Sequence, residues 1–290
     1  MSIGTIEGTV NPWEYMCQRW NQFTPPGRPS VQDIENYRTL LYRSFEGKPA
    51  DHYNVMVLGA TPEIRDMLAE DERISVTLVD ITIDMLISMS KLMTQNTDRE
   101  IWVKSDWLAA PLQQGYFDAI LSDLVICNVA REKHDLFYKK ILSFLKPDGH
   151  WINRVYFVDD NTYIRSLDEL LEEYSRKPVI TKEDINNFRS TAGLIAWNEE
   201  EKLLDWRLLY EEMKRYHING KFVHPNPKAA QILEGTYELF KPFDKKYFLD
   251  TEEGTEAEFN QYFKIIERIP DQSVVELKEK AYYIYDLVRK

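Results

Sequence analysis

Residues 54 to 157 alternate between short apolar runs and segments of helical periodicity, and this alternation constrains the fold more than any other feature. The apolar runs lie within 54–59, 74–80, 99–107, 115–126 and 150–157. Helical patterns fill 61–70, 81–95 and 131–149. Continuous apolar strands separated by helices are typical of a parallel sheet covered on both faces. The sequence therefore predicts an α/β fold with a doubly wound, mostly parallel sheet.

The sequence predicts four segments, a core and three segments around it. Residues 1–50 contain two helical patterns joined by the turn "TPPGRPS" and are expected to form an N-terminal helical cover, with Ser30 as an N-cap. Residues 51–157 form the expected core. Residues 158–242 are helical and acidic in pattern and are too long for a loop, so we expect a helical insertion there. Residues 243–290 should complete the sheet, through the apolar runs "KKYFLDT" and "AYYIYDLVRK" as an antiparallel edge pair.

Composition limits the classes of partner and compartment. A hydrophobic fraction of 43% allows a substantial core. The net charge of −12 is unfavourable for a large nucleic-acid interface, which needs a field of Lys and Arg. No apolar run is long enough to span a membrane, and no secretory signal is visible at the N-terminus. The two cysteines, expected to be free, favour a reducing compartment, and we expect a cytoplasmic protein.

Gly59 ends the first apolar run and precedes a helical segment directly, as in nucleotide-binding turns. Ligands of open parallel sheets bind beyond the carboxyl ends of the strands. A phosphate loop usually has more glycines and a lysine, and Glu63 in the first helical turn would repel a phosphate. A neutral or zwitterionic ligand suits this loop better. A plain strand-to-helix connection is the alternative.

Acidic residues follow the later strands in the same way. Asp80 comes about twenty residues after the glycine, where a carboxylate can accept hydrogen bonds from a ribose diol. Its alternative role is to cap the next helix, which Thr82 could also do. Asp106 follows the third strand and can accept a hydrogen bond from an exocyclic amine. Trp107, the next residue, can cover a flat ring. Asp123 and Leu124 follow the fourth strand.

Over about residues 50 to 160, the chain resembles the class I S-adenosylmethionine-dependent methyltransferases. The resemblance rests on five motifs in this order: VLG, VD-x-T-x-x-ML, SDW, FDAILSDLVI and LKPDG. The loop "LGATPE" has one glycine where the family more often has G-x-G-x-G. Together with "QFTPPGRPS", it is similar to a bacterial branch of the superfamily with TPE at this position. The resemblance implies a Rossmann-like sheet, an antiparallel C-terminal edge strand, and S-adenosylmethionine as cofactor with S-adenosylhomocysteine as product.

The resemblance also implies roles for the matching positions. Gly59 and Ala60 would lie beside the methionine part of the cofactor, Asp80 would bind the ribose hydroxyls, and Ile81 would pack on adenine. Asp106 would accept from the adenine amine, near the Trp107 backbone, and Asp123 and Leu124 would border the methionine part and the methyl group. The expected cofactor-binding set is Gly59, Ala60, Thr61, Asp80, Ile81, Met85, Asp106, Trp107, Asp123 and Leu124.

The acceptor is less constrained by the sequence. In-line methyl transfer mainly requires alignment, so no catalytic residue is assigned. No Cys or His cluster surrounds either cysteine, so no metal is expected. "SDLVICN" lacks the Pro-Pro-aromatic motif of many DNA-base methyltransferases, so DNA is not the expected partner. A small-molecule acceptor is the main hypothesis. A protein or RNA acceptor, and a non-catalytic cofactor-binding relative, are the alternatives. His217 or His224 could face the acceptor, and a homodimer is compatible with the sequence, which does not determine the oligomeric state.

Overall fold

The computed structural model describes residues 12–48, 51–95, 98–158, 166–239, 245–270 and 282–290. The chain forms two compact units. One contains residues 1–24 and 163–247, and the other contains residues 25–162 and 248–290. The boundary therefore runs through the segment 1–50 that was expected to form one helical cover. We describe each unit by itself.

The larger unit is built on a seven-stranded sheet with the order β11-β12-β5-β4-β1-β2-β3. Its strands are β1 (Tyr53–Leu58), β2 (Ile74–Asp80), β3 (Glu100–Lys104), β4 (Phe117–Asp123), β5 (Leu145–Tyr156), β11 (Phe263–Pro270) and β12 (Tyr282–Arg289). Strands β1 to β5 are parallel to one another, whereas β12 is antiparallel to both β5 and β11. The predicted Rossmann-like, mostly parallel sheet with an antiparallel C-terminal edge is confirmed.

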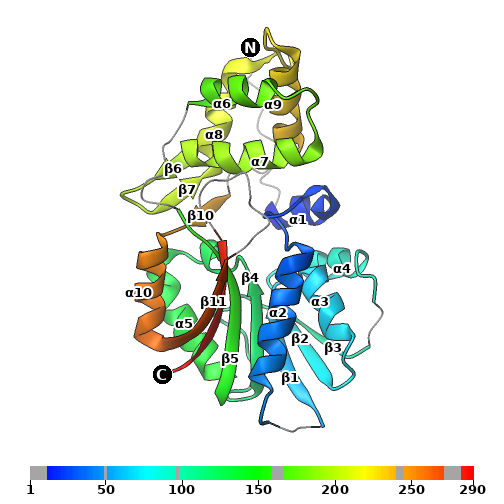
Figure 1. The fold of residues 1–290 in the computed structure, drawn as a ribbon, viewed down its shortest axis with the longest axis vertical. Coiled ribbons are helices and arrows are strands. Elements are labelled where there is room, and N and C mark those ends of the chain that lie inside the picture. The colour runs from blue at the N-terminus through cyan, green and yellow to red at the C-terminus, as the bar shows by residue number, and fades with distance from the viewer. Residues whose placement is uncertain (1–11, 49–50, 96–97, 159–165, 240–244, 271–281) are drawn as a thin grey trace. The chain divides into compact units, whose positions relative to one another are not determined.

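Helices cover both faces of this sheet, as continuous apolar strands require. Figure 1 shows α5 (His134–Phe144) and α10 (Glu252–Tyr262) on one side, and α2 (Val31–Ser44), α3 (Pro62–Ala69) and α4 (Ile83–Ser90) on the other. The short helices η2 (Ile126–Asn128) and η3 (Arg131–Lys133) join β4 to α5. Aromatic residues dominate the core under α5 and α10; they include Phe137, Tyr138, Trp151, Phe259, Phe263 and Tyr285.

Local sequence signals explain where the helices begin. The Ser30 side chain accepts a hydrogen bond from the Asp33 N–H, and the Asp33 side chain accepts one from the Ser30 N–H. The expected N-cap is therefore part of a capping box. Pro62 occupies the first position of α3, where its missing N–H costs nothing. Thr61 and Thr82 stand at N-cap positions, but neither side chain makes the capping hydrogen bond.

The C-terminal part differs from the prediction in one respect. The run "KKYFLDT" was expected to pair with the last strand, but β10 (Lys246–Phe248) lies in a separate three-stranded sheet, β10-β7-β6. The edge position belongs to β11, which follows α10 directly. The strand pattern of β11 is interrupted by Lys264, Glu267 and Arg268, because an edge strand can leave polar side chains in water.

The smaller unit is mostly helical. It contains α1 (Pro12–Cys17), η1 (Trp20–Gln22), α6 (Leu167–Ser175), α7 (Lys182–Gly193), η4 (Leu194–Ala196), α8 (Trp206–Met213), η5 (Lys214–Tyr216) and α9 (Pro227–Leu239). The segment expected to be a helical insertion also contains strands that its pattern does not show. Short strands β6 (Trp197–Asn198), β7 (Leu203–Asp205), β8 (His217–Ile218) and β9 (Lys221–Phe222) are present. Strands of two or three residues are too short to produce an alternating pattern.

The segment "NEEEKLLDWRLLYEEMKRY" (198–216) has an apolar stripe of Leu203, Trp206, Tyr210 and Met213 and predicts one helix, but the observed helix begins later. Leu203–Asp205 pairs as a strand, and the Asp205 side chain then accepts from the Arg207 backbone and begins α8. Across the described ranges, no helix is both long and apolar enough to cross a membrane. Cys17 and Cys127 are both free and buried.

Candidate active site

The predicted residues converge on one edge of the larger sheet. Gly59 follows β1, Asp80 ends β2, Asp106 follows β3 by two residues, and Asp123 ends β4. Because these strands are parallel, their carboxyl ends meet at the same edge. The chain runs outward from β1 to β3 and then returns to β4 on the other side of β1. Gly59 and Asp123 therefore flank the point where the strand order reverses, the usual ligand site of such sheets.

The loop after β1 is open to a ligand. Gly59 has φ +95°, a conformation that side chains rarely tolerate, and its N–H donates to the Val79 carbonyl at 2.8 Å. A Cβ built at Gly59 would meet no protein atom within 4 Å. Ala60 and Thr61, by contrast, are buried. The backbone at Gly59 therefore adjoins open space, while the rest of the loop is fixed by packing.

Asp80 and Ile81 form a polar–apolar pair at the end of β2. Asp80 is buried, and its Oδ1 accepts from the Thr82 N–H at 2.9 Å, so the carboxylate does organise the start of α4. Ile81 is 53% exposed, whereas Met85 on α4 is buried. An exposed isoleucine beside a fixed carboxylate suits a ligand with a flat apolar face and hydroxyl groups.

The loop after β3 is held to β2. The Ser105 N–H donates to the Asp80 carbonyl at 2.9 Å, and the Trp107 indole N–H donates to the Val79 carbonyl at 2.8 Å. Trp107 packs against the main core. Asp106 is exposed, and its Oδ1 accepts from the Leu108 N–H at 2.9 Å.

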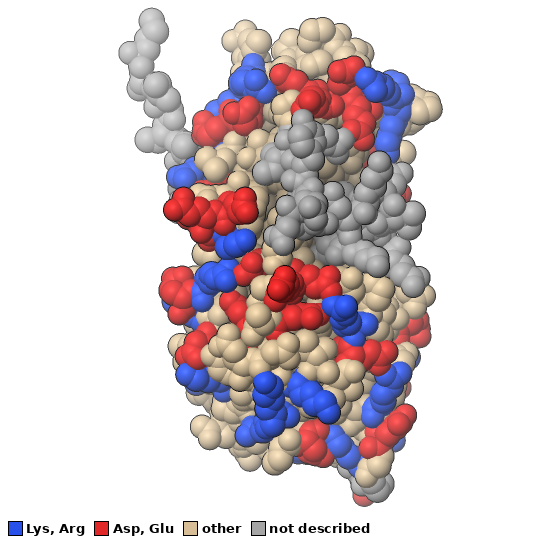
Figure 2. All heavy atoms as spheres, turned by 60° about the vertical axis from the view of Figure 1, so that its left-hand side comes forward, with Lys and Arg blue, Asp and Glu red and all other residues tan. Residues whose placement is uncertain are grey.

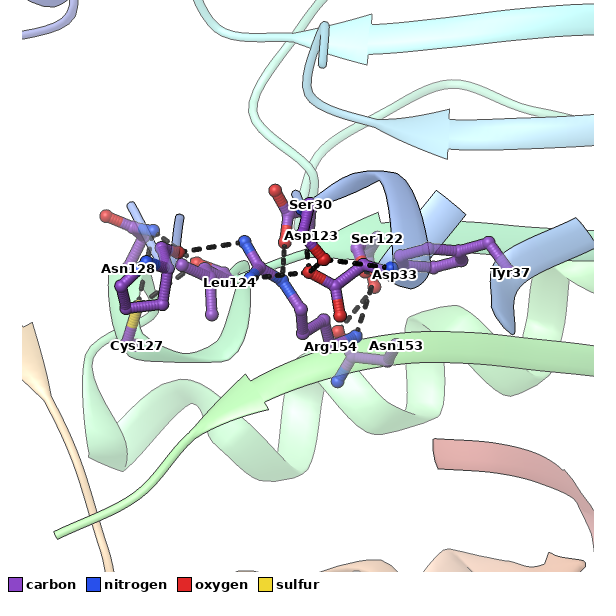
Figure 3. A network of polar contacts seen from close by, with 11 residues as sticks. Ser30, Asp33, Tyr37, Ser122, Asp123, Leu124, Cys127, Asn128, Asn153 and Arg154 are labelled. Atoms are coloured by element: carbon purple, nitrogen blue, oxygen red, sulfur yellow. Dashed lines mark hydrogen bonds and ion pairs between the residues drawn. The ribbon is translucent and has the colours of Figure 1, made fainter. Parts of the chain in front are cut away.

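Leu124 has an unusual backbone conformation directly after Asp123. Its φ of +53° lies in the left-handed region, which costs on the order of 1–3 kcal/mol for a residue with a side chain. The Leu124 carbonyl accepts from Asn128 Nδ2 at 2.7 Å and from Cys127 Sγ at 3.1 Å. The Leu124 N–H donates to the Arg154 carbonyl at 3.0 Å (Figure 3). Several contacts thus fix the turn that carries Asp123 and Leu124.

Arg154 is the centre of a buried charge network that the sequence analysis missed. Its side chain is fully buried, and its Nε donates to Asp123 Oδ1 at 2.6 Å (Figure 3). Asp33 Oδ2 lies 3.5 Å from Nη1, and Nη2 donates to the Pro26 carbonyl at 3.1 Å. Burial lowers the pKa of Arg154, but Asp123 and Asp33 outweigh it, so the pKa lies above its usual value. The guanidinium therefore stays charged and joins the segment before α2 to the end of β4.

Tyr37 of α2 adds a second connection to the same edge. Its hydroxyl donates to the Ser122 carbonyl at 2.6 Å and accepts from the Arg154 N–H at 3.0 Å. Burial, with Asp123 nearby, raises the pKa of Tyr37 well above its usual value, so the hydroxyl remains protonated. Ser122 Oγ in turn donates to Asn153 Oδ1 at 2.7 Å (Figure 3). The network thus fixes the position of β4 relative to α2.

Glu63 and Arg28 form a second charged pair next to the first loop. Arg28 Nε donates to Glu63 Oε1 at 2.5 Å. Burial raises the pKa of Glu63 above its usual value even though Arg28 lowers it, and the charge of Asp123 raises it further. Glu63 Oε2 is buried and has no hydrogen-bond partner among the described residues. A buried carboxylate oxygen without a donor is unfavourable, so this position suits a bound cation.

Two signals of these networks were present in the sequence. Asn153 and Arg154 are consecutive polar residues inside the apolar run 150–157, and buried charges occur where they are paired. Asp33 stands three residues after the N-cap Ser30, and its capping role conceals its second role beside Arg154. No pattern in the sequence joins Arg28 to Glu63 or Tyr37 to Ser122, because those contacts depend on the packing of α2.

In the described ranges, no group of three or more His, Cys, Asp or Glu side chains is placed to hold a metal ion. The two histidines considered for the acceptor lie in the smaller unit. His217 packs against Phe222 and Tyr237, and His224 Nδ1 accepts from the Asn226 N–H at 3.0 Å.

Residues 59–153 match a family model described as a methyltransferase domain. No curated protein matches the sequence. The fold resembles a Rhodobacter sphaeroides protein described as a Zn-dependent alcohol dehydrogenase, with TM-score 0.56 and 16% identity, covering 97% of this chain and 100% of that one. It also resembles the CurJ carbon methyltransferase, with TM-score 0.56 and 10% identity, covering 96% of this chain and 61% of that one.

A third similar structure is a complex between the Haloferax volcanii Trm112 methyltransferase activator and a methyltransferase, with TM-score 0.50 and 10% identity, covering 97% and 99% of the two chains. At these identities, the structural likeness shows the fold alone. The family model adds the activity, since it spans the loops after β1 to β4 and ends inside β5. Residues 59–153 therefore form a methyltransferase domain, and the chain is an enzyme that uses S-adenosylmethionine as its cofactor.

Proposed function

We propose that this enzyme transfers the methyl group of S-adenosylmethionine to a small-molecule acceptor by in-line displacement. The observation that carries the proposal is the sheet edge near the reversal of strand order. An open glycine turn, a buried Asp80 and a Glu63 oxygen without a hydrogen-bond partner among the described residues lie there. These groups match a ligand that comes close to the backbone at the glycine turn, carries a diol and has a positive charge.

We assign the cofactor contacts residue by residue on that edge. Asp80 accepts from the ribose hydroxyls, and the exposed Ile81 packs on adenine, with Met85 behind it. Asp106 accepts from the adenine amine, beside the backbone of Trp107. Gly59, Ala60 and Thr61 adjoin the methionine part, and Asp123 and Leu124 border the methyl group. The exposure of Ile81 and Asp106 and the burial of Asp80 support this order.

Glu63 supplies the negative charge for the amino-acid end of the cofactor. Its Oε1 is held by Arg28, which leaves the buried Oε2 directed to a donor that the described residues do not provide. An α-ammonium group is such a donor, and its positive charge would offset the burial that raises the Glu63 pKa. Arg28, whose side chain is 28% exposed, is our candidate partner for the α-carboxylate of the same zwitterion.

Replacing Glu63 with glutamine should weaken S-adenosylhomocysteine binding by about 10- to 100-fold, since a hydrogen bond to a charged group contributes about 1.5–3 kcal/mol. Binding of 5′-methylthioadenosine, which lacks the amino-acid end, should not change. Isothermal titration calorimetry of both ligands measures the difference. Glu70→Gln removes a carboxylate from the exposed end of the same helix and is the matched control. Equal losses for both ligands would contradict the assignment.

The chain's own contribution to catalysis is alignment. When bound, the cofactor supplies an electrophilic methyl group on a sulfonium sulfur. Asp123 lies near the proposed methyl position, but its carboxylate is engaged by Arg154 and serves to position the loop. An acceptor with a free lone pair needs no general base, so orientation behind the methyl group can supply most of the rate enhancement.

A small acceptor is consistent with the charge of the protein. The net charge is −12, and the described residues on the face drawn in Figure 2 intermix acidic and basic side chains rather than forming a basic surface. A polyanionic acceptor such as RNA needs clustered Lys and Arg. The segment 158–242 is our candidate for acceptor selection.

The first test is calorimetric titration of the whole chain with S-adenosylmethionine and S-adenosylhomocysteine. We expect micromolar binding of both. A folded protein that binds neither ligand would contradict the proposal. Transfer of a labelled methyl group from the cofactor into fractionated cell extract then identifies the acceptor class. Label in the low-molecular-weight fraction supports a small molecule, and label only in protein or RNA rejects it.

A further inference from the structure

Leu124 adopts a backbone conformation that its own side chain disfavours. Among the described residues other than glycine, φ is positive at Leu124, Lys202 and Asn219. Lys202 and Asn219 lie in the connections of two short hairpins, where such a conformation closes the turn. Leu124 instead joins β4 to η2 at the ligand edge of the sheet. Hairpin closure therefore does not account for its conformation.

Hydrogen bonds hold the chain on both sides of this residue. Before it, pairing of β4 with β5 extends to the Leu124 N–H, which donates to the Arg154 carbonyl at 3.0 Å. After it, the Asn128 N–H donates to the Val125 carbonyl at 2.9 Å within η2. The Leu124 carbonyl lies between these two backbone ladders. Two side chains donate to it, Asn128 Nδ2 at 2.7 Å and Cys127 Sγ at 3.1 Å (Figure 3).

Asn128 is the stronger of these two donors, because an amide N–H donates well and a thiol donates weakly. A glycine at position 124 would adopt the observed φ without strain, yet the chain carries a leucine whose side chain stays partly exposed. Disfavoured backbone conformations persist where neighbouring groups enforce them, and they cluster at functional sites. The Asn128 amide supplies that enforcement here.

The φ of Leu124 sets the direction of its side chain relative to Asp123, because rotation about the N–Cα bond moves every atom beyond it. Asp123 itself is held by Arg154, whose Nε donates to Oδ1 at 2.6 Å. Without the Asn128 donor, Leu124 is free to relax to a negative φ, and its side chain then leaves its place beside Asp123. In-line transfer tolerates little misplacement, since about 1 Å can lower the rate about 100-fold.

We propose that Asn128 is a positioning residue for methyl transfer, which holds the Leu124 carbonyl and so maintains the left-handed turn beside the methyl group. This role rests on the proposed function, in which Asp123 and Leu124 border that group. Asn128 acts through the turn rather than on the reacting atoms. Its loss should therefore affect the methyl end of the cofactor and leave the adenosine end unchanged.

The first experiment compares two ligands that differ only in the methyl group and the positive charge that it gives the sulfur. In Asn128→Ala, the dissociation constant of S-adenosylmethionine should rise about 2- to 10-fold more than that of S-adenosylhomocysteine, the range for loss of one neutral hydrogen bond. Adenosine, which ends at the ribose, should bind as in the wild type. Isothermal titration calorimetry measures all three constants.

Two features separate positioning from a purely structural role. A structural role alone would lower the melting temperature without changing the ratio of the two dissociation constants. Asn128→Leu has nearly the same shape as the native side chain but no donor, so it should change the ratio as Asn128→Ala does.

The second experiment measures methyl transfer at saturating S-adenosylmethionine, into whichever fraction of cell extract the wild type labels. Asn128→Ala should slow transfer about 10- to 100-fold, because the displaced turn disturbs alignment. Cys127→Ser keeps a hydroxyl donor at the second contact and should stay closer to the wild type. Asn36→Ala makes the same substitution on α2, where the amide oxygen accepts from Gln32, and is the matched control.

Failure of this role is distinguishable from failure of the proposed function. A wild type that binds neither S-adenosylmethionine nor S-adenosylhomocysteine would remove the proposed function and the role of Asn128 with it. A wild type that binds both, with an Asn128→Ala variant of unchanged ratio or unchanged transfer rate, would overturn the positioning role alone.

Discussion

Replacing Arg154 with methionine is expected to lower the free energy of unfolding by about 3–5 kcal/mol, because the substitution leaves buried carboxylates without their cation. Asp123 and Asp33 both depend on this guanidinium, and neither side chain can reach water to recover its solvation. Urea denaturation followed by circular dichroism measures the change, provided that the slope of the transition stays constant.

Two comparisons make that experiment specific. Arg38→Met breaks a more exposed ion pair with Glu70 and should cost less than about 1 kcal/mol. Adding Asp123→Asn to Arg154→Met should recover part of the loss, because an unpaired amide costs less than an unpaired charge. If Arg154→Met were no more destabilising than Arg38→Met, the buried network would not be a main support of this edge.

The second large effect is expected at Asp80. Asp80→Ala should weaken S-adenosylhomocysteine binding more than tenfold, because each hydrogen bond from a ribose hydroxyl to the carboxylate contributes about 1.5–3 kcal/mol. The measurement is the dissociation constant from calorimetric titration of the purified variant.

Asp80 also accepts from the Thr82 backbone, so part of the loss could come from a displaced α4. Asp80→Asn retains an oxygen for that bond and separates the two roles. Its affinity should still fall, while its thermal stability should match the wild type. Asp84→Asn, an exposed acid on α4, is the control for charge. Unchanged affinity in Asp80→Ala would remove Asp80 from the cofactor site.

Elements with strong, long patterns were predictable from the sequence. The five parallel strands and the helices between them follow from apolar runs bounded by turns, and parallel strands bring Gly59, Asp80, Asp106 and Asp123 to one edge. The start of α2 was predictable because its capping box is local in sequence. The short strands of the smaller unit, and edge strand β11, were not predictable, since their stability depends on neighbours distant in the chain.

The sequence by itself determined the five parallel strands and the positions at which polar residues follow them, because hydrophobic periodicity and turn residues act over a few positions. The order of these strands in the sheet is visible only in the structure. Only the tertiary structure decided which of those residues are paired. Packing of α2 brings Asp33 and Tyr37 to β4 and β5, and packing of the segment before it brings Arg28 to Glu63. Such partners lie about 30 to 120 residues apart in the chain, and the free energy of a buried charge depends on which groups the fold places around it.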